Sequence, residues 1–300
     1  MTIAVVAALA LAAAPATILT IAPQHRLIEG VATDGRTIWV SSLIDRQILR
    51  CDKRCAAIAT LPEGLHPFAI AWDKQRKRLW VAADCPPGVP FIKACERGAL
   101  IALDRHGKIR TRISPFVGQF HPGDVSASNG QVFVSDSQNG MVFRLVSNDR
   151  AIMAVVLPGV GKSAQGTALD PSGTHLVVAD YSQGIGLADP STFKRELLPR
   201  EDGRPLRGVD GLVRCGQRYY GIYNGSAPGQ LLSFTINGDR IVVDQPVPGL
   251  ELPDPTQVAF DGRRLLVVSD SGWEMAGKGT ARTKGAPIIA IPFGKDCKPL

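Results

Sequence analysis

The chain has 300 residues, of which 45% are hydrophobic, 20% charged and 6% aromatic, and this balance excludes a disordered or fibrous protein. Its 31 glycines and 22 prolines interrupt the sequence about every sixth residue, which excludes long helices and favours short strands joined by turns. The net charge of +7 comes from scattered groups such as Asp73–Arg78 and Lys278–Lys284. Because no basic stripe interleaved with aromatic residues occurs, we expect solvated hairpin tips and no nucleic-acid partner.

The N-terminal segment has the pattern of an export signal. Residues Met1–Ala14 form an apolar run without an acidic residue, and Ala12–Ala14 or Ala14–Ala16 supplies the small residues of a cleavage site. The run lacks an initial Lys or Arg, so a retained N-terminal anchor is the alternative. Pro15 ends the run short of the roughly 20 residues that cross a bilayer. We therefore expect a signal peptide over residues 1–16 and a secreted or periplasmic protein with no membrane contact after leader removal.

One pattern then occurs six times along the chain. Each copy begins with an alternating apolar segment, passes a turn containing Gly or Asn, and continues into a second β-rich segment that ends on a small or acidic residue. The copies lie 39 to 55 residues apart and start at Glu29, Phe68, Gly123, Gln165, Asp210 and Thr256. Their second segments are Ile38–Val40, Leu79–Val81, Val132–Val134, Leu176–Val178, Tyr219–Ile222 and Leu265–Val268.

Strands at this spacing predict four-stranded antiparallel blades around an axis, and six copies predict an all-β, six-bladed β-propeller. Met141–Val146 and Ala151–Leu157 are examples of the two further strands that follow in most copies. Ile18–Ile21 and Ile288–Ile291 are expected to pair in one blade and close the ring. The even spacing without a linker indicates a single domain over residues 17–300, and we expect a monomer. A pair of β-sandwiches with accidental periodicity is the alternative.

The six cysteines agree with export, because an even number can pair completely in an oxidising compartment. Cys51 and Cys55 flank a turn-like tripeptide, Cys85 and Cys95 bracket a proline-rich loop, and Cys215 and Cys297 are left over. The alternative is a zinc site. Because no Cys-x-x-Cys occurs and the spacings do not suit a zinc knuckle, three disulfides are favoured.

The innermost strands of a propeller all begin at one mouth of the channel, so the first residues of the six copies form a ring. In this first ring Glu29, Gln165 and Asp210 bring two carboxylates and an amide together, which are the hard oxygen ligands that Ca²⁺ prefers. The ends of the second segments return to the same mouth as a second ring of Ser42, Asp84, Asp136, Asp180, Asn224 and Asp270. These residue types favour turns, so most of the second ring is expected to be structural.

His66 and His121 are each followed by proline and stand just before a first strand, in adjacent copies. Either side chain could act as a general acid or base near neutral pH, and a turn role is the alternative. The chain has no Gly-x-Ser-x-Gly sequence, so a serine hydrolase of that type is not expected.

Several short motifs resemble those of the gluconolactonase, senescence-marker-protein and strictosidine-synthase-like propellers. They are Glu29–Gly30, Gly123–Val125, Gln165–Gly166, Asp210–Leu212 and Tyr223–Gly225, and the resemblance spans about residues 25–295. It implies a divalent ion, commonly calcium, held by a Glu of the first blade, Asn residues of middle blades and an Asp of the fifth. Glu29 and Asp210 match these positions. Gln165 stands in place of one Asn, and Gly123 or Pro122 in place of another.

The resemblance also implies a reaction, the hydrolysis of a small-molecule lactone or related ester. In it the metal would polarise the carbonyl, Asp210 would serve as metal ligand and possible base, and His121 would carry the proton. One alternative is a non-catalytic propeller whose mouth binds a ligand or a protein. Another is a carbon–carbon condensation of the strictosidine type, which needs an amine-binding carboxylate that the sequence does not place. Because a fold alone does not decide between these functions, the metal content of the purified protein is the first observation to make.

Overall fold

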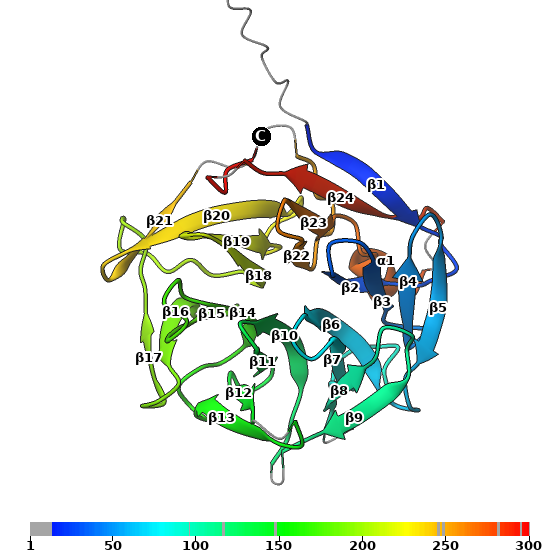
Figure 1. The fold of residues 1–300 in the computed structure, drawn as a ribbon, viewed down its shortest axis with the longest axis horizontal. Coiled ribbons are helices and arrows are strands. Elements are labelled where there is room, and N and C mark those ends of the chain that lie inside the picture. The colour runs from blue at the N-terminus through cyan, green and yellow to red at the C-terminus, as the bar shows by residue number, and fades with distance from the viewer. Residues whose placement is uncertain are drawn as a thin grey trace, which may run out of the picture.

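The computed structural model describes residues 14–95, 97–115, 118–146, 149–244, 247, 250–280, 283–294 and 296–299. It contains six four-stranded antiparallel sheets that surround a central axis, so the predicted six-bladed β-propeller is confirmed (Figure 1). Five sheets run in chain order from the axis outwards, and the sixth takes its outermost strand from the N-terminal end. All six predicted second segments lie in second strands of blades.

Every blade has four strands that follow one another from the axis outwards. The first three blades consist of β2 (Ile28–Thr33), β3 (Ile38–Ser42), β4 (Gln47–Cys51) and β5 (Cys55–Thr60); β6 (His66–Asp73), β7 (Arg78–Asp84), β8 (Ala99–Leu103) and β9 (Ile109–Ile113); and β10 (Pro122–Ser128), β11 (Gln131–Asp136), β12 (Val142–Leu145) and β13 (Ile152–Val156). The last three consist of β14 (Ala164–Leu169), β15 (Leu176–Asp180), β16 (Gly184–Asp189) and β17 (Lys194–Leu197); β18 (Val209–Cys215), β19 (Arg218–Tyr223), β20 (Gln230–Asn237) and β21 (Arg240–Val243); and β22 (Val258–Phe260), β23 (Arg264–Val268), β24 (Ala286–Pro292) and β1 (Ala16–Ile21).

The ring closes in the sixth blade, as predicted. Strand β1 pairs antiparallel with β24 from Ala16 opposite Ala290 to Ile21 opposite Ala286, and the two run side by side at the top of Figure 1. All three predicted disulfides are also present: Cys51–Cys55 joins β4 to β5, Cys85–Cys95 closes the proline-rich loop, and Cys215–Cys297 ties the C-terminal segment to β18. Within the described ranges no cysteine is free.

The core lies between the blades, and this position explains the sequence pattern. Blades pack face to face, so their middle strands are covered on both sides, and β15 is buried along its whole length. The outer strand β17 is largely exposed and includes the exposed apolar side chain of Leu197. Between the first two blades the ring of Trp39 stacks on that of Trp72, with 4.7 Å between their centroids. Burial of one such large side chain contributes about 2–3 kcal/mol.

Several local expectations are refined by the structure. The group Asp73–Arg78 forms the hairpin tip between β6 and β7, where the Asp73 carboxylate accepts bonds from backbone N–H groups of the turn. His66 opens β6 and is not in the preceding loop, whereas His121 directly precedes β10. The only helix among the described residues is the short α1 (Trp273–Gly277) after the sixth blade's second strand. No helix in the described part of the chain is long and apolar enough to cross a membrane.

The predicted leader, residues 1–16, falls almost entirely outside the described residues, which begin at residue 14.

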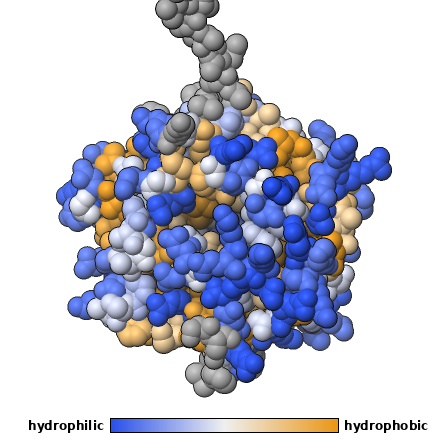
Figure 2. Space-filling model, viewed as in Figure 1, coloured by the Kyte–Doolittle hydropathy of each residue, from blue (hydrophilic) through white to orange (hydrophobic). Residues whose placement is uncertain are grey.

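Figure 2 shows one face of the ring: hydrophilic side chains cover most of its middle, and hydrophobic residues gather mainly toward the rim. Polar groups therefore surround the axis on this face.

Candidate functional site

The two predicted rings meet at one mouth of the channel. In each blade the start of the first strand pairs with the end of the second, for example Ile28 with Ser42 and Pro122 with Asp136. In five blades the register between the first and second strands shifts once, after the first one or two residue pairs, and the regular pairing of the two strands follows the shift. The first-ring residues therefore lie at the axis, and the second-ring residues lie behind them at the same mouth.

Glu29 is the acidic group that the first blade contributes. Its Oε2 accepts a hydrogen bond of 2.5 Å from the indole Nε1 of Trp273 in α1. Burial raises the pKa of Glu29 well above its ordinary value, and the negative charges of Asp210, Asp254 and Asp124 raise it further, while the bond from Trp273 opposes the shift. The carboxylate is thus held in a region of high negative potential.

Asp210 is the matching group of the fifth blade. Its Oδ2 accepts a 2.8 Å bond from Nδ2 of Asn224, which lies directly after β19 and also reaches the carbonyl of Pro255 at 3.3 Å. Burial raises the pKa of Asp210 to about 7, and the bond from Asn224 opposes this rise. The other amide atom, Oδ1 of Asn224, is buried and has no hydrogen-bond partner among the described residues.

These features fit a hard cation. The pKa values of Glu29 and Asp210 are raised without a lysine or arginine among the causes, so the site gathers negative charge that a bound cation would offset. The unpartnered amide oxygen of Asn224 is a further oxygen donor. Within the described ranges, no three His, Cys, Asp or Glu side chains form a metal-binding group by themselves. A metal at this mouth would therefore need amide oxygens beside the carboxylates.

Gln165 lies next to Gly123 of the neighbouring blade. A Cβ atom added to Gly123 would come within 3.1 Å of Oε1 of Gln165 and within 2.8 Å of Cβ of Ser137. The Nε2 atom of Gln165 donates to Oγ of Ser163 at 3.4 Å. The longer Gln side chain thus occupies the space that a side chain at position 123 would need. Its role as a metal ligand stays a prediction.

His121 is buried and has a carboxylate partner. Its Nδ1 lies 3.1 Å from Oδ1 of Asp84, and the two side chains are only 3% and 1% exposed. Burial raises the pKa of Asp84 to about 6, against opposing bonds from the backbone of Cys85 and from His121. No interaction among the described residues joins the His121 ring to Glu29 or Asp210, so its catalytic role stays a prediction. His66 contacts the carbonyl of Leu43 through Nδ1 at 2.9 Å.

Two members of the second ring, Asp136 and Asp180, hold turns, whereas Asn224 does not. Asp136 accepts bonds from the backbone N–H groups of Gln138 and Asn139, and Asp180 accepts bonds from those of the residues that follow it. These contacts are the turn-stabilising pattern expected for such residues. Asn224 differs because its side chain turns toward Asp210 at the axis.

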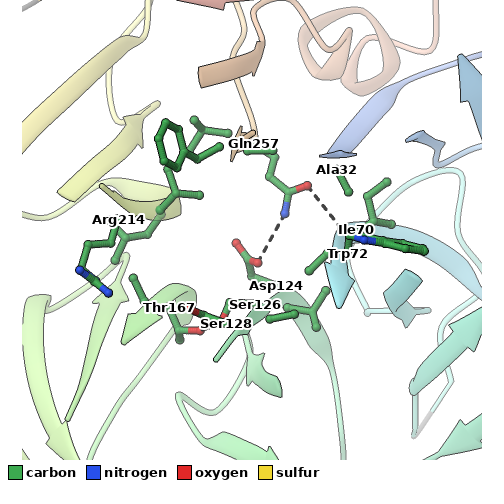
Figure 3. A pocket seen from close by; sticks show the side chains of 18 of the residues that line it. Ala32, Ile70, Trp72, Asp124, Ser126, Ser128, Thr167, Arg214 and Gln257 are labelled. Atoms are coloured by element: carbon green, nitrogen blue, oxygen red, sulfur yellow. Dashed lines mark hydrogen bonds between the residues drawn. The ribbon is translucent and has the colours of Figure 1, made fainter. Parts of the chain in front are cut away.

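The other half of the channel contains a cavity of about 240 Å³. It is lined by the later parts of the six inner strands, from Val31 in the first blade to Phe260 in the sixth, so it lies beyond the first ring along the axis. Asp124 and Gln257 stand between the cavity and that ring. Nε2 of Gln257 lies 3.5 Å from Oδ1 of Asp124, while its Oε1 accepts bonds from the backbone N–H groups of Val31 and Ile70 (Figure 3).

Trp273, Gln257 and Asp124 were not predicted as site residues from the sequence, and Asn224 was expected in a largely structural ring. Trp273 follows the last member of the second ring by three residues, which was a usable signal of proximity to the mouth. Asp124 directly follows a first-ring position, and Gln257 follows another. Asp124 and Gln257 therefore lie in the next layer of the channel wall.

Comparisons with known proteins support the fold. No protein-family model matches the chain, and no curated protein matches it. Among solved structures, a gluconolactonase from Xanthomonas campestris is similar with a TM-score of 0.62 and 16% identity, over 93% of this chain and 89% of that one. A PQQ-bound aldose sugar dehydrogenase from Streptomyces coelicolor has a TM-score of 0.62 and 13% identity, over 92% and 97%. Regucalcin, a calcium-binding protein from Agrobacterium tumefaciens, has a TM-score of 0.57 and 16% identity, over 90% of each chain.

The resemblance to gluconolactonase-type propellers is thus confirmed at the level of the fold. The dehydrogenase shows that the same fold also serves another chemistry. The function of this chain must therefore be argued from its own residues.

Proposed function

We propose that the chain is a hydrolase of lactones or related esters and that it acts at the mouth formed by Glu29, Asp210 and Asn224. The reaction would require a bound divalent cation, and calcium is the ion that we expect. The observation that carries the proposal is that the carboxyl groups of Glu29 and Asp210, whose pKa values burial raises, lie at the same mouth as the buried, unpartnered Oδ1 of Asn224. Gluconolactonase and calcium-binding neighbours of the same fold support it.

The residues at the mouth have separable roles in this proposal. Glu29, Asp210 and Asn224 would hold the cation, with Gln165 as the further amide predicted from the sequence. When bound, a divalent cation would polarise the substrate carbonyl and lower the pKa of water. The indole of Trp273 fixes the orientation of Glu29 through its hydrogen bond.

Asp210 is also the proposed proton acceptor. Asn224 donates to its Oδ2, which leaves Oδ1 without a hydrogen-bond partner among the described residues. In hydrolysis, the water oxygen forms a bond to the carbonyl carbon and gives a proton to Asp210, the C–O ester bond breaks, and the leaving oxygen takes up a proton. His121 stays the predicted carrier of that second proton, and its buried bond to Asp84 would have to open for this role.

The experiment compares wild type with Asp210→Asn and Asp136→Asn. Calcium at 100 times its Kd stabilises a native protein by about 2.7 kcal/mol. We expect calcium to raise the melting temperature of the wild type and Asp136→Asn, and not that of Asp210→Asn, because only the last substitution removes a charge from the site. Hydrolysis of a panel of five- and six-membered lactones and phenyl esters should be lost in Asp210→Asn and largely kept in Asp136→Asn.

A wild type without bound metal by elemental analysis, and without a thermal response to calcium, manganese or zinc, would refute this function. The non-catalytic binding propeller would then be the better account. Binding of metal without hydrolysis of any substrate in the panel would reject the hydrolase and retain the metal site.

We also propose that the chain is exported and that its leader is removed near residue 16. The apolar run at the N-terminus and the complete pairing of cysteines support this proposal. Intact mass of the protein recovered outside the cytoplasm, measured after alkylation without reduction, should correspond to a start at Ala16 or Thr17 and no alkylated cysteine. A mass that includes Met1 would contradict cleavage, and an alkylated cysteine would contradict complete pairing.

A further inference from the structure

A second site is indicated in the half of the channel away from Glu29 and Asp210. The cavity there is large enough for a ligand of several non-hydrogen atoms, since 240 Å³ is about eight times the volume that one water molecule takes in the liquid. Its lining combines apolar side chains with hydroxyl groups such as those of Ser126 and Thr167. It is distinct from the proposed hydrolytic mouth because its lining contains none of Glu29, Asp210 and Asn224.

Asp124 is the acidic residue that lines this cavity. The residue is 6% exposed, and Figure 3 shows its carboxylate directed into the channel. Oδ1 faces the Gln257 amide at 3.5 Å, which is a long contact, and no side chain among the described residues bonds to Oδ2. A buried carboxylate without a positive partner is costly, and a cationic ligand would relieve that cost.

Arg214 lines the same cavity without neutralising Asp124. Its Nε donates to the carbonyl of Leu169 at 2.6 Å, and its Nη1 donates to the carbonyl of Gly216. In Figure 3 its guanidinium points away from the Asp124 carboxylate. Arg214 is therefore not the counterion of Asp124.

Hydroxyl groups continue from Asp124 along the same strand. Ser126 and Ser128 follow at alternate positions of β10, so all three side chains share one face of the strand at intervals of about 7 Å. Oγ of Ser126 lies 2.6 Å from Oγ1 of Thr167 on the neighbouring blade. A molecule with an ammonium group and a hydroxyl group two carbons apart can reach Asp124 with one end and the Ser126–Thr167 pair with the other.

We propose that this cavity binds a small primary amine that carries a hydroxyl group, with the ammonium on Asp124 and the hydroxyl on the Ser126–Thr167 pair. An ammonium offers three N–H donors and a positive charge, which Asp124 lacks as a partner among the described residues. A calcium ion fits less well, because it requires six to eight oxygen ligands and the cavity presents one carboxylate.

Ethanolamine is the probe, and its binding is measured by calorimetry and by the melting temperature at constant ionic strength. Ethylene glycol keeps a hydroxyl and lacks the charge, whereas ethylamine keeps the charge and lacks the hydroxyl. We expect wild type to bind ethanolamine more tightly than ethylamine and to show no binding of ethylene glycol. Asp124→Asn should weaken ethanolamine binding at least about tenfold, because it removes a charge-assisted hydrogen bond.

Two further variants locate the site. Ser126→Ala should weaken ethanolamine binding about threefold to tenfold and leave ethylamine binding unchanged, as loss of one neutral hydrogen bond predicts. Glu274→Gln removes a negative charge from an exposed helix position, so its affinity for ethanolamine should equal that of wild type.

Equal responses to ethanolamine and ethylene glycol would overturn the proposal, and this comparison holds even if Asp124→Asn does not fold. Unchanged ethanolamine affinity in a folded Asp124→Asn variant would overturn it as well. A calcium response that Asp124→Asn abolishes, in the absence of amine binding, would assign the cavity to a metal ion instead.

Discussion

The Cys215–Cys297 bond should be the disulfide that contributes most to stability, because it closes a segment of 82 residues, whereas Cys51–Cys55 closes one of 4. In the chain-entropy description, closing these loops lowers the stability of the unfolded state by about 4.5 and about 2 kcal/mol respectively. Replacing both cysteines of a pair by alanine removes the bond without leaving a reactive thiol. The double variant Cys215→Ala/Cys297→Ala should thus be less stable than Cys51→Ala/Cys55→Ala by about 2.5 kcal/mol.

These free energies convert to melting temperatures through the entropy of unfolding. At about 2.1 cal/mol/K per residue, a chain of this size unfolds with roughly 600 cal/mol/K. We therefore expect the melting temperature to fall by about 8 °C in the Cys215/Cys297 variant and by about 3 °C in the Cys51/Cys55 variant. Differential scanning calorimetry under non-reducing conditions measures both values.

Other contacts also hold the C-terminal segment in place. The ring of Phe293 packs on that of Tyr220 with 4.8 Å between centroids, and the Tyr220 hydroxyl donates to the carbonyl of Cys297. A reducing agent should lower the wild-type melting temperature at least as far as the Cys215/Cys297 variant and leave the difference between variants much smaller. Equal shifts for the two double variants under oxidising conditions would refute the loop-closure reasoning.

Two further predictions concern buried charges. The pKa of Asp84 is about 6 in the folded protein, against 3.8 ordinarily, so folding favours the protonated carboxyl group. The stability that this preference contributes is complete below pH 3.8 and is lost as the pH rises through about 6. The loss amounts to at most about 3 kcal/mol. Asp84→Asn should consequently gain stability relative to wild type between pH 4 and 7 in urea titrations, and a constant difference across that range would contradict the assigned shift. The side chains of Arg195 and Asp180 form an ion pair and are 1% and 0% exposed. Arg195→Met should destabilise the protein by about 3–5 kcal/mol, because it leaves Asp180 buried without its partner. A loss below about 1 kcal/mol in the same titrations would show that the backbone N–H bonds to Asp180 are enough to stabilise its charge.

The blade architecture could be predicted from the sequence because its determinants are local and repeated. Each blade needs alternating or continuous apolar segments separated by turns, and segments such as Leu176–Val178 carry that pattern within a few residues. Pairing of the two chain ends followed from β-rich segments left over at both termini. The ring positions of Glu29 and Asp210 followed from the same periodicity, since the start of every inner strand must face the axis.

The contacts within the channel were decided by the tertiary structure alone. Trp273 bonds to Glu29 across 244 residues of sequence, and Gln257 reaches Val31 across 226 residues and Asp124 across 133. These contacts depend on how six blades are rotated about one axis and on which rotamer each side chain adopts, and no local pattern encodes either. The sequence therefore determined which residues begin the inner strands at the mouth, because strand pattern and direction are local, whereas only the packing of the blades determined which side chains touch there.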